Sequence, residues 1–339
     1  MITAIGSSTT SDAPPDRRWQ TVWRDSITDP RELLDVLGLS DHSATLLPAS
    51  DTGFAMRVPR GFVARMQFGD PADPLLLQVL PRAAELIDRS GYAADPVGDG
   101  RAKVADGVIH KYEGRALLIA TGACAINCRY CFRRHFPYSD ETASASSWHA
   151  ALAFLRSESS ITEVILSGGD PLSLSTSKLA QFTDALTALP QIRRLRIHSR
   201  LPIVLPERID EELLTWLART PLQKTFVVHA NHGNEIDDSV RAACVRLRSA
   251  DVTVLNQSVL LRGINDSVVA LAHLSEALID IGVVPYYLHQ LDHVRGAAHF
   301  EVEDDIARHL VEQLRSRLPG YLVPRLVREV AGEPSKTPL

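Results

Sequence analysis

Three cysteines lie close together near the middle of the chain, Cys124, Cys128 and Cys131, in the spacing C-x3-C-x2-C. Thiolate sulfur is a soft ligand that suits iron–sulfur clusters and zinc. A four-iron cluster held by three thiolates has one iron without a protein ligand, and a small molecule can bind and react there. The alternative is a structural Cys3His zinc site with His135 as the fourth ligand. The cysteines by themselves leave both sites open.

A glycine-rich segment, LSGGDP at 166–171, is the second candidate site. Its paired glycines, Gly168 and Gly169, let backbone amides and carbonyls approach a ligand more closely than a residue with a side chain allows. The alternative is an ordinary turn between a strand and a helix, with a residue that caps the helix.

Strand-like and helix-like patterns alternate from about residue 116 onwards. Apolar runs at 116–122, 162–170, 193–200, 224–231, 253–263 and 283–292 precede amphipathic stretches at 144–158, 175–189, 209–219, 237–250, 266–281 and 302–318. Six such units, each about 30 residues long, predict a parallel sheet with crossover helices. A doubly wound open sheet is the alternative, but its GxGxxG turn is absent.

Polar residues follow the ends of the predicted strands. They are Cys124, Gly168, Gly169, Asp170, Ser199, Arg200, His229, Gln257 and Asp292. In a barrel, the carboxyl ends of the strands converge on one mouth, where catalytic sites are found. The sequence therefore predicts an α/β fold with a partial (β/α)6 barrel, whose lateral opening admits a bulky substrate.

Four segments are expected along the chain. Residues 1–15 are small and polar and are predicted to be disordered. Residues 16–107 are predicted to form a helical N-terminal region, in which Asp29 and Pro30 begin a helix over 32–39 as N-cap and first-turn proline. An amphipathic stretch at 71–87 is interrupted by prolines. The barrel is expected over 108–320, followed by a C-terminal segment over 321–339.

The composition is that of a soluble enzyme, with 45% apolar and 23% charged residues in a chain of 339. A net charge of −5 gives no basic face for nucleic acid, and no apolar run is long enough to cross a membrane. The N-terminus lacks the features of a secretory signal. Clustered cysteines indicate metal binding rather than disulfides, which favours the cytoplasm. The fourth cysteine, Cys244, is predicted to be a buried structural thiol.

From about residue 111 to residue 338 the chain resembles the lysine 2,3-aminomutases, a family of radical S-adenosylmethionine enzymes. The cysteine loop TGACAINCRYCFRRHFPY (121–138) and the tail GEPSKTPL (332–339) resemble the bacterial branch that makes (R)-β-lysine for elongation factor P. The resemblance implies an isomerase that moves the α-amino group of L-lysine to the β-carbon. It also implies an electron donor and a separate ligase that attaches the product to the factor. Action on lysine already attached to the factor is the alternative.

The resemblance implies three cofactors: a [4Fe–4S] cluster, S-adenosylmethionine and pyridoxal phosphate. The three cysteines would bind the cluster. Gly168, Gly169 and Asp170 would lie along the methionine part of S-adenosylmethionine, Ser199 and Arg200 near its ribose or carboxylate, and His229 against its adenine. Gln257 would sit beside both small cofactors. Without the resemblance, His229 is read as a core histidine and Gln257 as a hydrogen-bonding residue at a strand end.

Lys336 is the residue that the resemblance makes the imine partner of pyridoxal phosphate. Imine formation needs a neutral, desolvated amine, so the tail must fold into the barrel mouth. Lys111 and Arg115 would bind the phosphate, and Tyr112 would pack against the ring. The alternative is a mobile, solvated tail lysine and ordinary surface salt bridges.

The expected substrate carries a carboxylate at one end and an ammonium at the other. By resemblance, Arg133 would bind the carboxylate, and Asp292 and Glu329 would hold the ε-ammonium. The alternatives are a turn residue at Asp292 and an exposed strand charge at Glu329. Glu329 stands where better-known members have aspartate, so its reach is one methylene longer. The free-lysine catabolic enzymes of the family have an additional cysteine-bound zinc site. This chain has Ser267 there, so that zinc site is expected to be absent.

Overall fold

A single curved sheet organises the described part of the chain. The computed structural model describes residues 19–138, 142–143 and 148–339, so the predicted disorder of residues 1–15 lies outside the described residues. The sheet has ten strands in the order β1 to β10. They are β1 Lys103–Ala105, β2 Val108–Tyr112, β3 Arg115–Thr121, β4 Glu163–Gly168, β5 Arg194–Ser199, β6 Gln223–Val228, β7 Val252–Val259, β8 Val284–His289, β9 Arg325–Arg328 and β10 Thr337–Pro338.

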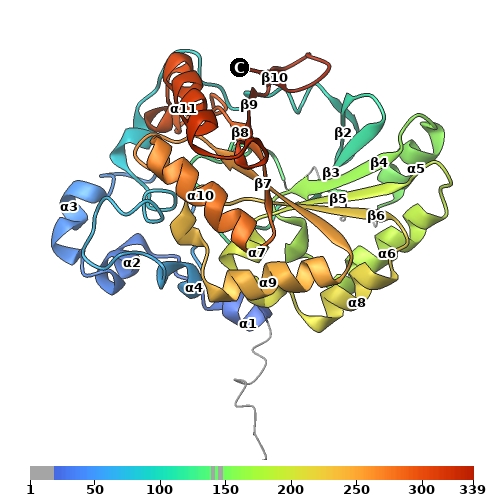
Figure 1. Cartoon of the computed structure of the whole chain (residues 1–339), viewed down its shortest axis with the longest axis horizontal. Coiled ribbons are helices and arrows are strands. Elements are labelled where there is room, and N and C mark those ends of the chain that lie inside the picture. Colours follow the sequence, from blue (N-terminus) through green and yellow to red (C-terminus); the bar gives the residue numbers. More distant parts are fainter. Residues whose placement is uncertain (1–18, 139–141, 144–147) are drawn as a thin grey trace, which may run out of the picture.

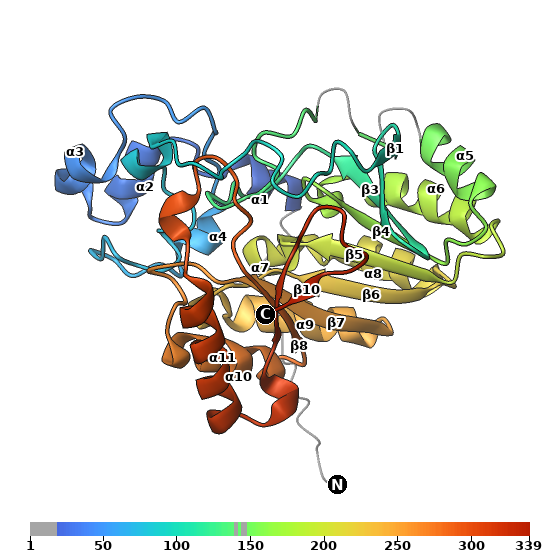
Figure 2. The ribbon, with the colours of Figure 1, turned by 90° about the horizontal axis from the view of Figure 1, so that it is seen from above.

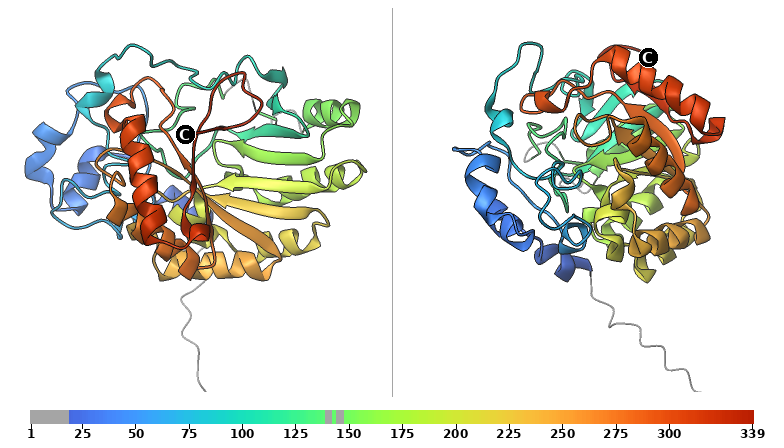
Figure 3. Two further views of the ribbon diagram at one scale, coloured as in Figure 1. Left: turned by 45° about the horizontal axis from the view of Figure 1, so that its top comes forward. Right: turned by 60° about the vertical axis from the view of Figure 1, so that its left-hand side comes forward.

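Strands β3 to β9 are parallel neighbours, which confirms the predicted α/β partial barrel. β1 and β2 add an antiparallel hairpin beside β3, and β10 returns antiparallel to β9. The order of the described strands does not pair β1 with β10, so the barrel is open between its two edges. Figure 3 shows the strands fanning into this curved sheet.

Helices cover the outer face of the sheet (Figure 1). They are α5 His149–Ser157, α6 Thr176–Thr187, α7 Leu201–Val204, α8 Glu211–Arg219, α9 Asp238–Ser249, α10 Val268–Asp280 and α11 Asp304–Arg317. All of them except α7 agree with the predicted amphipathic stretches to within a few residues, although 144–147 of the first stretch lie outside the described residues. The one-turn helix α7 was not predicted. Cys244 of α9 is fully buried, as predicted.

Side chains alternate between the two faces of each strand, and this alternation decides which residues face the barrel interior. In β5, Leu195 and Ile197 belong to the apolar core shared with the helices, so Arg196 and His198 face the interior. In β6, Phe226 and Val228 lie in that core, which leaves the next residue, His229, on the interior side. The outer face therefore builds the core, and the inner face is left for polar groups.

The N-terminal region forms short helices that lie beside the barrel (Figures 1 and 2). They are α1 Trp19–Arg24, α2 Pro30–Val36, α3 Ser43–Leu46 and α4 Arg60–Val63. The predicted start of α2 is confirmed, because the Asp29 side chain caps the helix by accepting from the Arg31 amide at 2.9 Å. The stretch at 71–87 consists of turns and one 3-10 helix, Ala83–Leu86.

The edges of the sheet differ from the sequence prediction. Lys111 and Tyr112 lie on β2, inside a strand that the prediction did not contain, and Arg115 is the first residue of β3. At the other edge, β9 continues the parallel sheet within the predicted C-terminal segment. Strands β2 and β9 are both short. Their formation depends on pairing with the neighbouring strand rather than on an apolar pattern within the strand itself.

Candidate active site

The cysteine loop follows β3 and is held by backbone hydrogen bonds to the N-terminal region. The Asn127 amide donates to the Arg57 carbonyl at 3.1 Å, and the Arg129 amide donates to the Gln78 carbonyl at 2.9 Å. Within the loop, the Cys131 amide donates to the Cys128 carbonyl at 3.0 Å. These contacts fix the backbone on both sides of Cys128.

The three thiols are close enough to influence one another electrostatically. Burial raises the pKa of Cys131 to about 11, and Cys128 adds to the rise. Burial also raises the pKa of Cys124, with further contributions from Asp170 and the other two cysteines. The Cys124 and Cys131 thiols are therefore protonated at neutral pH, and binding of a metal centre through them must be coupled to proton release. Three soft donors with this coupling fit a thiolate-bound cluster.

His135 is the fourth ligand of the zinc alternative. Its Nε2 atom lies 3.1 Å from the Arg295 carbonyl oxygen, which leaves Nδ1 as the ring nitrogen that a metal could use. Among the described residues, no group of three or more His, Cys, Asp or Glu side chains is arranged to hold a single metal ion.

The glycine turn packs directly against the cysteine loop. Gly168 has φ +119°, and a Cβ there would lie 2.8 Å from the Thr121 carbonyl oxygen. A Cβ at Gly169 would lie 2.5 Å from the Ala123 carbonyl oxygen. The Gly169 amide donates to Thr121 at 2.6 Å, and the Asp170 amide donates to Ala123 at 2.8 Å. Glycine is therefore required at both positions for the two loops to meet.

Asp170 joins the end of β4 to the end of β5. Its carboxylate accepts from the Ser199 hydroxyl at 2.8 Å and from the Arg200 amide at 2.7 Å. It also accepts from the Leu172 amide at 3.0 Å. Burial raises the pKa of Asp170 to about 6, while these hydrogen bonds act in the opposite direction. Asp170 and Ser199 thus organise the mouth, and their predicted contacts with S-adenosylmethionine stay predictions.

Three histidines face the barrel interior: His198 on β5, His229 after β6 and His289 on β8. The Nε2 atom of each is buried and has no hydrogen-bond partner among the described residues. Burial, together with the positive charges of Arg200 and Lys336, lowers the pKa of His229 to about 3. His229 is therefore neutral and is close enough to both cations to be influenced by them. Its neutral ring can pack against a purine or a pyridine ring.

Lys336 lies inside the opening rather than in a solvated tail. Strand β10 carries it back to β9, and its Nζ atom lies 2.9 Å from Glu329 Oε2 and 5.8 Å from the centre of the Tyr287 ring. Figure 2 shows the C-terminal segment crossing the open side of the barrel. Glu329 also accepts from the Tyr112 hydroxyl at 2.7 Å, and Lys111 Nζ lies 3.5 Å away. The structure thus gathers Lys111, Tyr112, Glu329 and Lys336.

Glu329 is ionised in this cluster. Burial raises the pKa of Glu329, but Lys336, the Tyr112 hydrogen bond and Lys111 outweigh burial and hold the pKa below its usual value. The guanidinium carbon of Arg115 lies 4.5 Å from the centre of the Tyr112 ring. The structure therefore brings cations and an aromatic ring together here, and their predicted contacts with pyridoxal phosphate stay predictions.

Asp99 connects this cluster to Arg133. Its carboxylate lies 2.7 Å from Lys111 Nζ and 2.7 Å from Arg133 Nε, and the side chain is only 3% exposed. Arg133 Nη1 also donates to the Ser167 hydroxyl at 3.1 Å. A cavity of about 200 Å³ lies beside Asp99 and Arg133, lined in part by Phe132. An unbroken chain of ion pairs thus runs from Lys336 to Arg133.

Asp292 follows β8 and is close to the same charges. Burial raises the pKa of Asp292 to about 7, and Glu329 adds to the rise while Lys336 opposes it. A second buried carboxyl beside Glu329 favours binding of a cation, because a cation relieves the repulsion. Gln257 lies on β7 beside Tyr287 of β8, so it reaches the same side of the sheet.

Known proteins similar to this chain decide its family. No protein-family model matches the chain. The L-lysine 2,3-aminomutase of Escherichia coli strain K12 is 49% identical over 331 residues, which cover 97% of this chain and 96% of the relative. The chain belongs to the L-lysine 2,3-aminomutase family. The enzyme of that name from Haemophilus influenzae is 45% identical, over 95% of both chains, and that from Clostridium subterminale is 34% identical, over 96% of this chain and 77% of the relative.

Membership in the aminomutase family implies an isomerase that uses a [4Fe–4S] cluster, S-adenosylmethionine and pyridoxal phosphate. A radical S-adenosylmethionine methyltransferase from Sphaerobacter thermophilus is a distant structural neighbour, with a TM-score of 0.43 and 18% identity over 65% of this chain and 68% of the other. Every helix among the described residues is too short or too polar to cross a bilayer.

Sequence reasoning missed several residues that hold the site together. They are Gln78, Asp99, Tyr130, His198, Glu235 and His289. Asp99 and Gln78 come from the N-terminal region, where no pattern suggested chemistry. His198 and His289 carried a usable signal, because each lies within three residues of the end of a predicted strand. The other partners depend on contacts between distant segments, which no local pattern records.

Proposed function

We propose that this protein converts L-lysine to (R)-β-lysine and that the product serves the modification of elongation factor P. The observation that carries the proposal is the continuous ion-pair chain from Lys336 through Glu329, Lys111 and Asp99 to Arg133. It joins one amine, two further cations and two carboxylates in a row that ends at Arg133, two residues after Cys131. A substrate with a carboxylate at one end and an ammonium at the other complements these charges.

The chain's own residues supply position and charge. When bound, the reduced cluster and S-adenosylmethionine supply a radical that removes hydrogen from the substrate, and pyridoxal phosphate supplies the π system that lets nitrogen migrate. Lys336 would hold pyridoxal phosphate covalently, and Lys111 and Arg115 would bind its phosphate. Tyr112 would pack against its ring. His229 and Gln257 would lie between the two small cofactors.

Substrate binding would use the groups at the two ends of the site. Arg133 would bind the carboxylate through its guanidinium, whose orientation is set by Asp99 and Ser167. Asp292 and Glu329 would receive the ε-ammonium, since a buried ammonium needs such partners. The reacting carbons would then be held between Lys336 and the cysteine loop.

Free lysine is the substrate that this charge pattern favours. Lysine attached to elongation factor P through its carboxyl group has no carboxylate to offer Arg133. Arg133 is 7% exposed and already paired with Asp99, so an amide at this place would leave a buried cation without its second anion. The proposal further includes a β-lysine ligase and an electron donor for the cluster. It also includes a cytoplasmic location, because thiolate ligands need a reducing compartment.

The test is an anaerobic assay with reductant, S-adenosylmethionine and isotopically labelled lysine, with the product analysed by chiral chromatography. We expect (R)-β-lysine from free lysine and no turnover in Cys128→Ala. The charged factor is offered in parallel, and conversion of the attached lysine alone would contradict the free-lysine proposal.

A second experiment tests Lys336 without relying on activity. The protein is loaded with pyridoxal phosphate, reduced with borohydride and digested, and the modified peptide is identified by mass spectrometry. We expect the label on Lys336 and its loss in Lys336→Ala, with Lys178→Ala as the control for an exposed lysine. Label on another lysine, or none, would contradict the assignment.

A further inference from the structure

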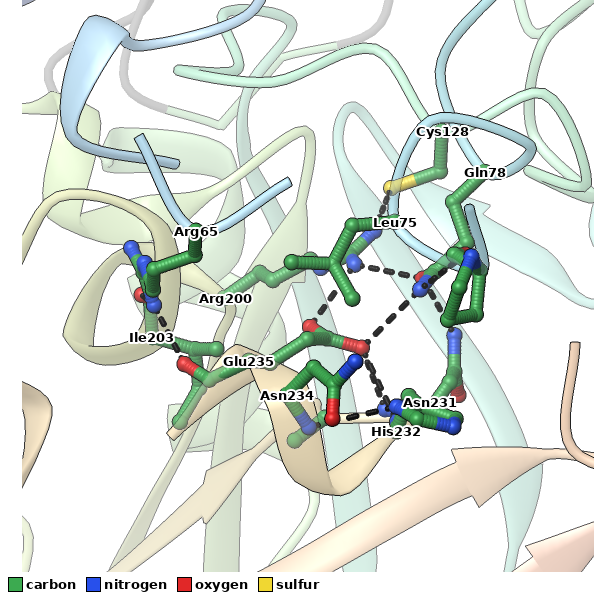
Figure 4. Close-up of polar contacts among 12 residues, drawn as sticks. Arg65, Leu75, Gln78, Cys128, Arg200, Ile203, Asn231, His232, Asn234 and Glu235 are labelled. Atoms are coloured by element: carbon green, nitrogen blue, oxygen red, sulfur yellow. Dashed lines mark hydrogen bonds and ion pairs between the residues drawn. The ribbon is translucent and has the colours of Figure 1, made fainter. Parts of the chain in front are cut away.

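Arg200 points at a cluster cysteine rather than into open space. Its Nη1 atom lies 2.6 Å from Cys128 Sγ and 2.7 Å from the Tyr130 hydroxyl oxygen. Its Nη2 atom lies 2.7 Å from Gln78 Oε1 and 3.0 Å from Glu235 Oε2. Figure 4 shows the Arg200 guanidinium between the Cys128 sulfur and the side chains of Gln78 and Glu235. Each of the four terminal N–H groups therefore has an acceptor.

The acceptors of Arg200 are themselves fixed. Gln78 Nε2 donates to Glu235 Oε1 at 3.1 Å, and Glu235 Oε1 also accepts from the Asn231 amide at 2.8 Å. Asn231 Nδ2 donates to the Tyr130 hydroxyl at 2.6 Å and to Gln78 Oε1 at 3.0 Å. Arg200 is 6% exposed and Glu235 is fully buried. The guanidinium is held in one orientation by a closed network.

The N-terminal region takes part in this network. Gln78 belongs to the turns at 71–80, and Arg65 Nη1 donates to the backbone carbonyls of Glu235 and Ile203. The side chain of Arg200 comes from the barrel, whereas two of the groups that fix its surroundings come from outside the barrel. This gives the N-terminal region a chemical task beyond covering the sheet.

We propose that Arg200, held by Gln78, Tyr130 and Glu235, is a positioning residue that raises the reduction potential of the cluster through Cys128. The inference rests on the cluster of the proposed function. A reduced cluster carries one more negative charge than an oxidised one, and hydrogen bonds to the ligand sulfur atoms stabilise that charge. A buried cation beside Cys128 does the same, and low polarity around it strengthens the effect.

Arg200 also has a donor left for S-adenosylmethionine. Its buried Nε atom has no hydrogen-bond partner among the described residues. The predicted contact of Arg200 with S-adenosylmethionine would therefore use Nε, while the two terminal nitrogens stay on Cys128 and its neighbours. One guanidinium would then contact both the electron-donating cluster and the molecule it reduces.

The network predicts two charge changes with opposite effects. Arg200→Met removes the cation and the N–H donors, so the oxidised cluster becomes relatively more stable and the potential falls. Glu235→Gln removes the anion that partly neutralises Arg200, so the potential rises. General damage to the site would move both variants in the same direction, whereas an electrostatic role moves them apart.

The test is a potentiometric titration of the anaerobically reconstituted full-length protein, followed by the EPR signal of the reduced cluster. Arg200→Met should destabilise the reduced cluster at least tenfold, which is about 59 mV for one electron. Arg200→Lys keeps the charge, so its reduction potential should lie between those of Arg200→Met and the wild type. If the Met variant holds no cluster, the Lys variant is compared with the wild type instead. Arg208→Lys is the matched control, because Arg208 is equally buried but binds the Leu172 and Leu174 carbonyls.

Each outcome decides the inference. Opposite shifts in the Arg200 and Glu235 variants, with an unchanged Arg208 control, would support it. Unchanged potentials, or shifts in one direction for both charge changes, would overturn it and leave the proposed function intact. Absence of a [4Fe–4S] cluster in the wild-type protein would overturn the proposed function as well.

Discussion

Glu85 offers the sharpest test of how the N-terminal region supports the cysteine loop. Its carboxylate receives two hydrogen bonds from Arg129, Nε at 2.9 Å and Nη2 at 2.6 Å, and one from Arg134 Nη2 at 2.7 Å. The three side chains are 0%, 0% and 1% exposed. Arg129 and Arg134 flank Cys131 in the sequence, so Glu85 anchors the loop that carries the cluster ligands.

We expect Glu85→Gln to lower the free energy of unfolding by about 3–5 kcal/mol, the cost of removing one partner from a buried ion pair. The glutamine keeps the volume and one acceptor but leaves two buried cations without a counter-ion. The measurement is urea denaturation of the cofactor-free protein under reducing conditions, in which a lower midpoint with an unchanged slope reports a loss of stability.

Glu211→Gln is the matched control for this experiment. Glu211 pairs with Arg246 at 2.6 Å, but the two side chains are 82% and 40% exposed. An exposed ion pair contributes about 0–1 kcal/mol. If Glu85→Gln and Glu211→Gln lose the same small amount of stability, the buried pair does not anchor the loop and the reasoning is refuted.

Three further predictions concern the site itself. Burial raises the pKa of Asp292 to about 7, so its carboxylate ionises as pH rises through that value. We therefore expect kcat/KM for L-lysine to increase with pH near 7 and Asp292→Asn to lose this increase. An increase that persists in the variant would contradict the role of Asp292. Gly169→Ala places a Cβ 2.5 Å from the Ala123 carbonyl oxygen, so we expect a loss of about 1–3 kcal/mol in stability and less iron bound. Gly320→Ala, which has open space around it and no positive φ, should bind iron normally. Asp99→Asn loosens Arg133, so KM for L-lysine should rise more than kcat falls; a change in kcat alone would argue against a binding role.

The alternation of strands and helices could be read from the sequence because it depends on local apolar patterns. The apolar run 162–170 contains β4, and the amphipathic stretch 237–250 contains α9. The edge strands could not be read in this way. β10 consists of Thr337 and Pro338 alone, and only its pairing with β9 makes it a strand and brings Lys336 into the opening.

The sequence by itself determined the chemical groups. The spacing of Cys124, Cys128 and Cys131 within one loop brings three thiols together, because a few residues cannot separate them far. The tertiary structure decided which charges meet. Lys111 and Glu329 are 218 residues apart, so no pattern within either segment could predict that they pair. Arg200 and Gln78 are 122 residues apart, and only the packing of the N-terminal region on the barrel turns the guanidinium toward Cys128.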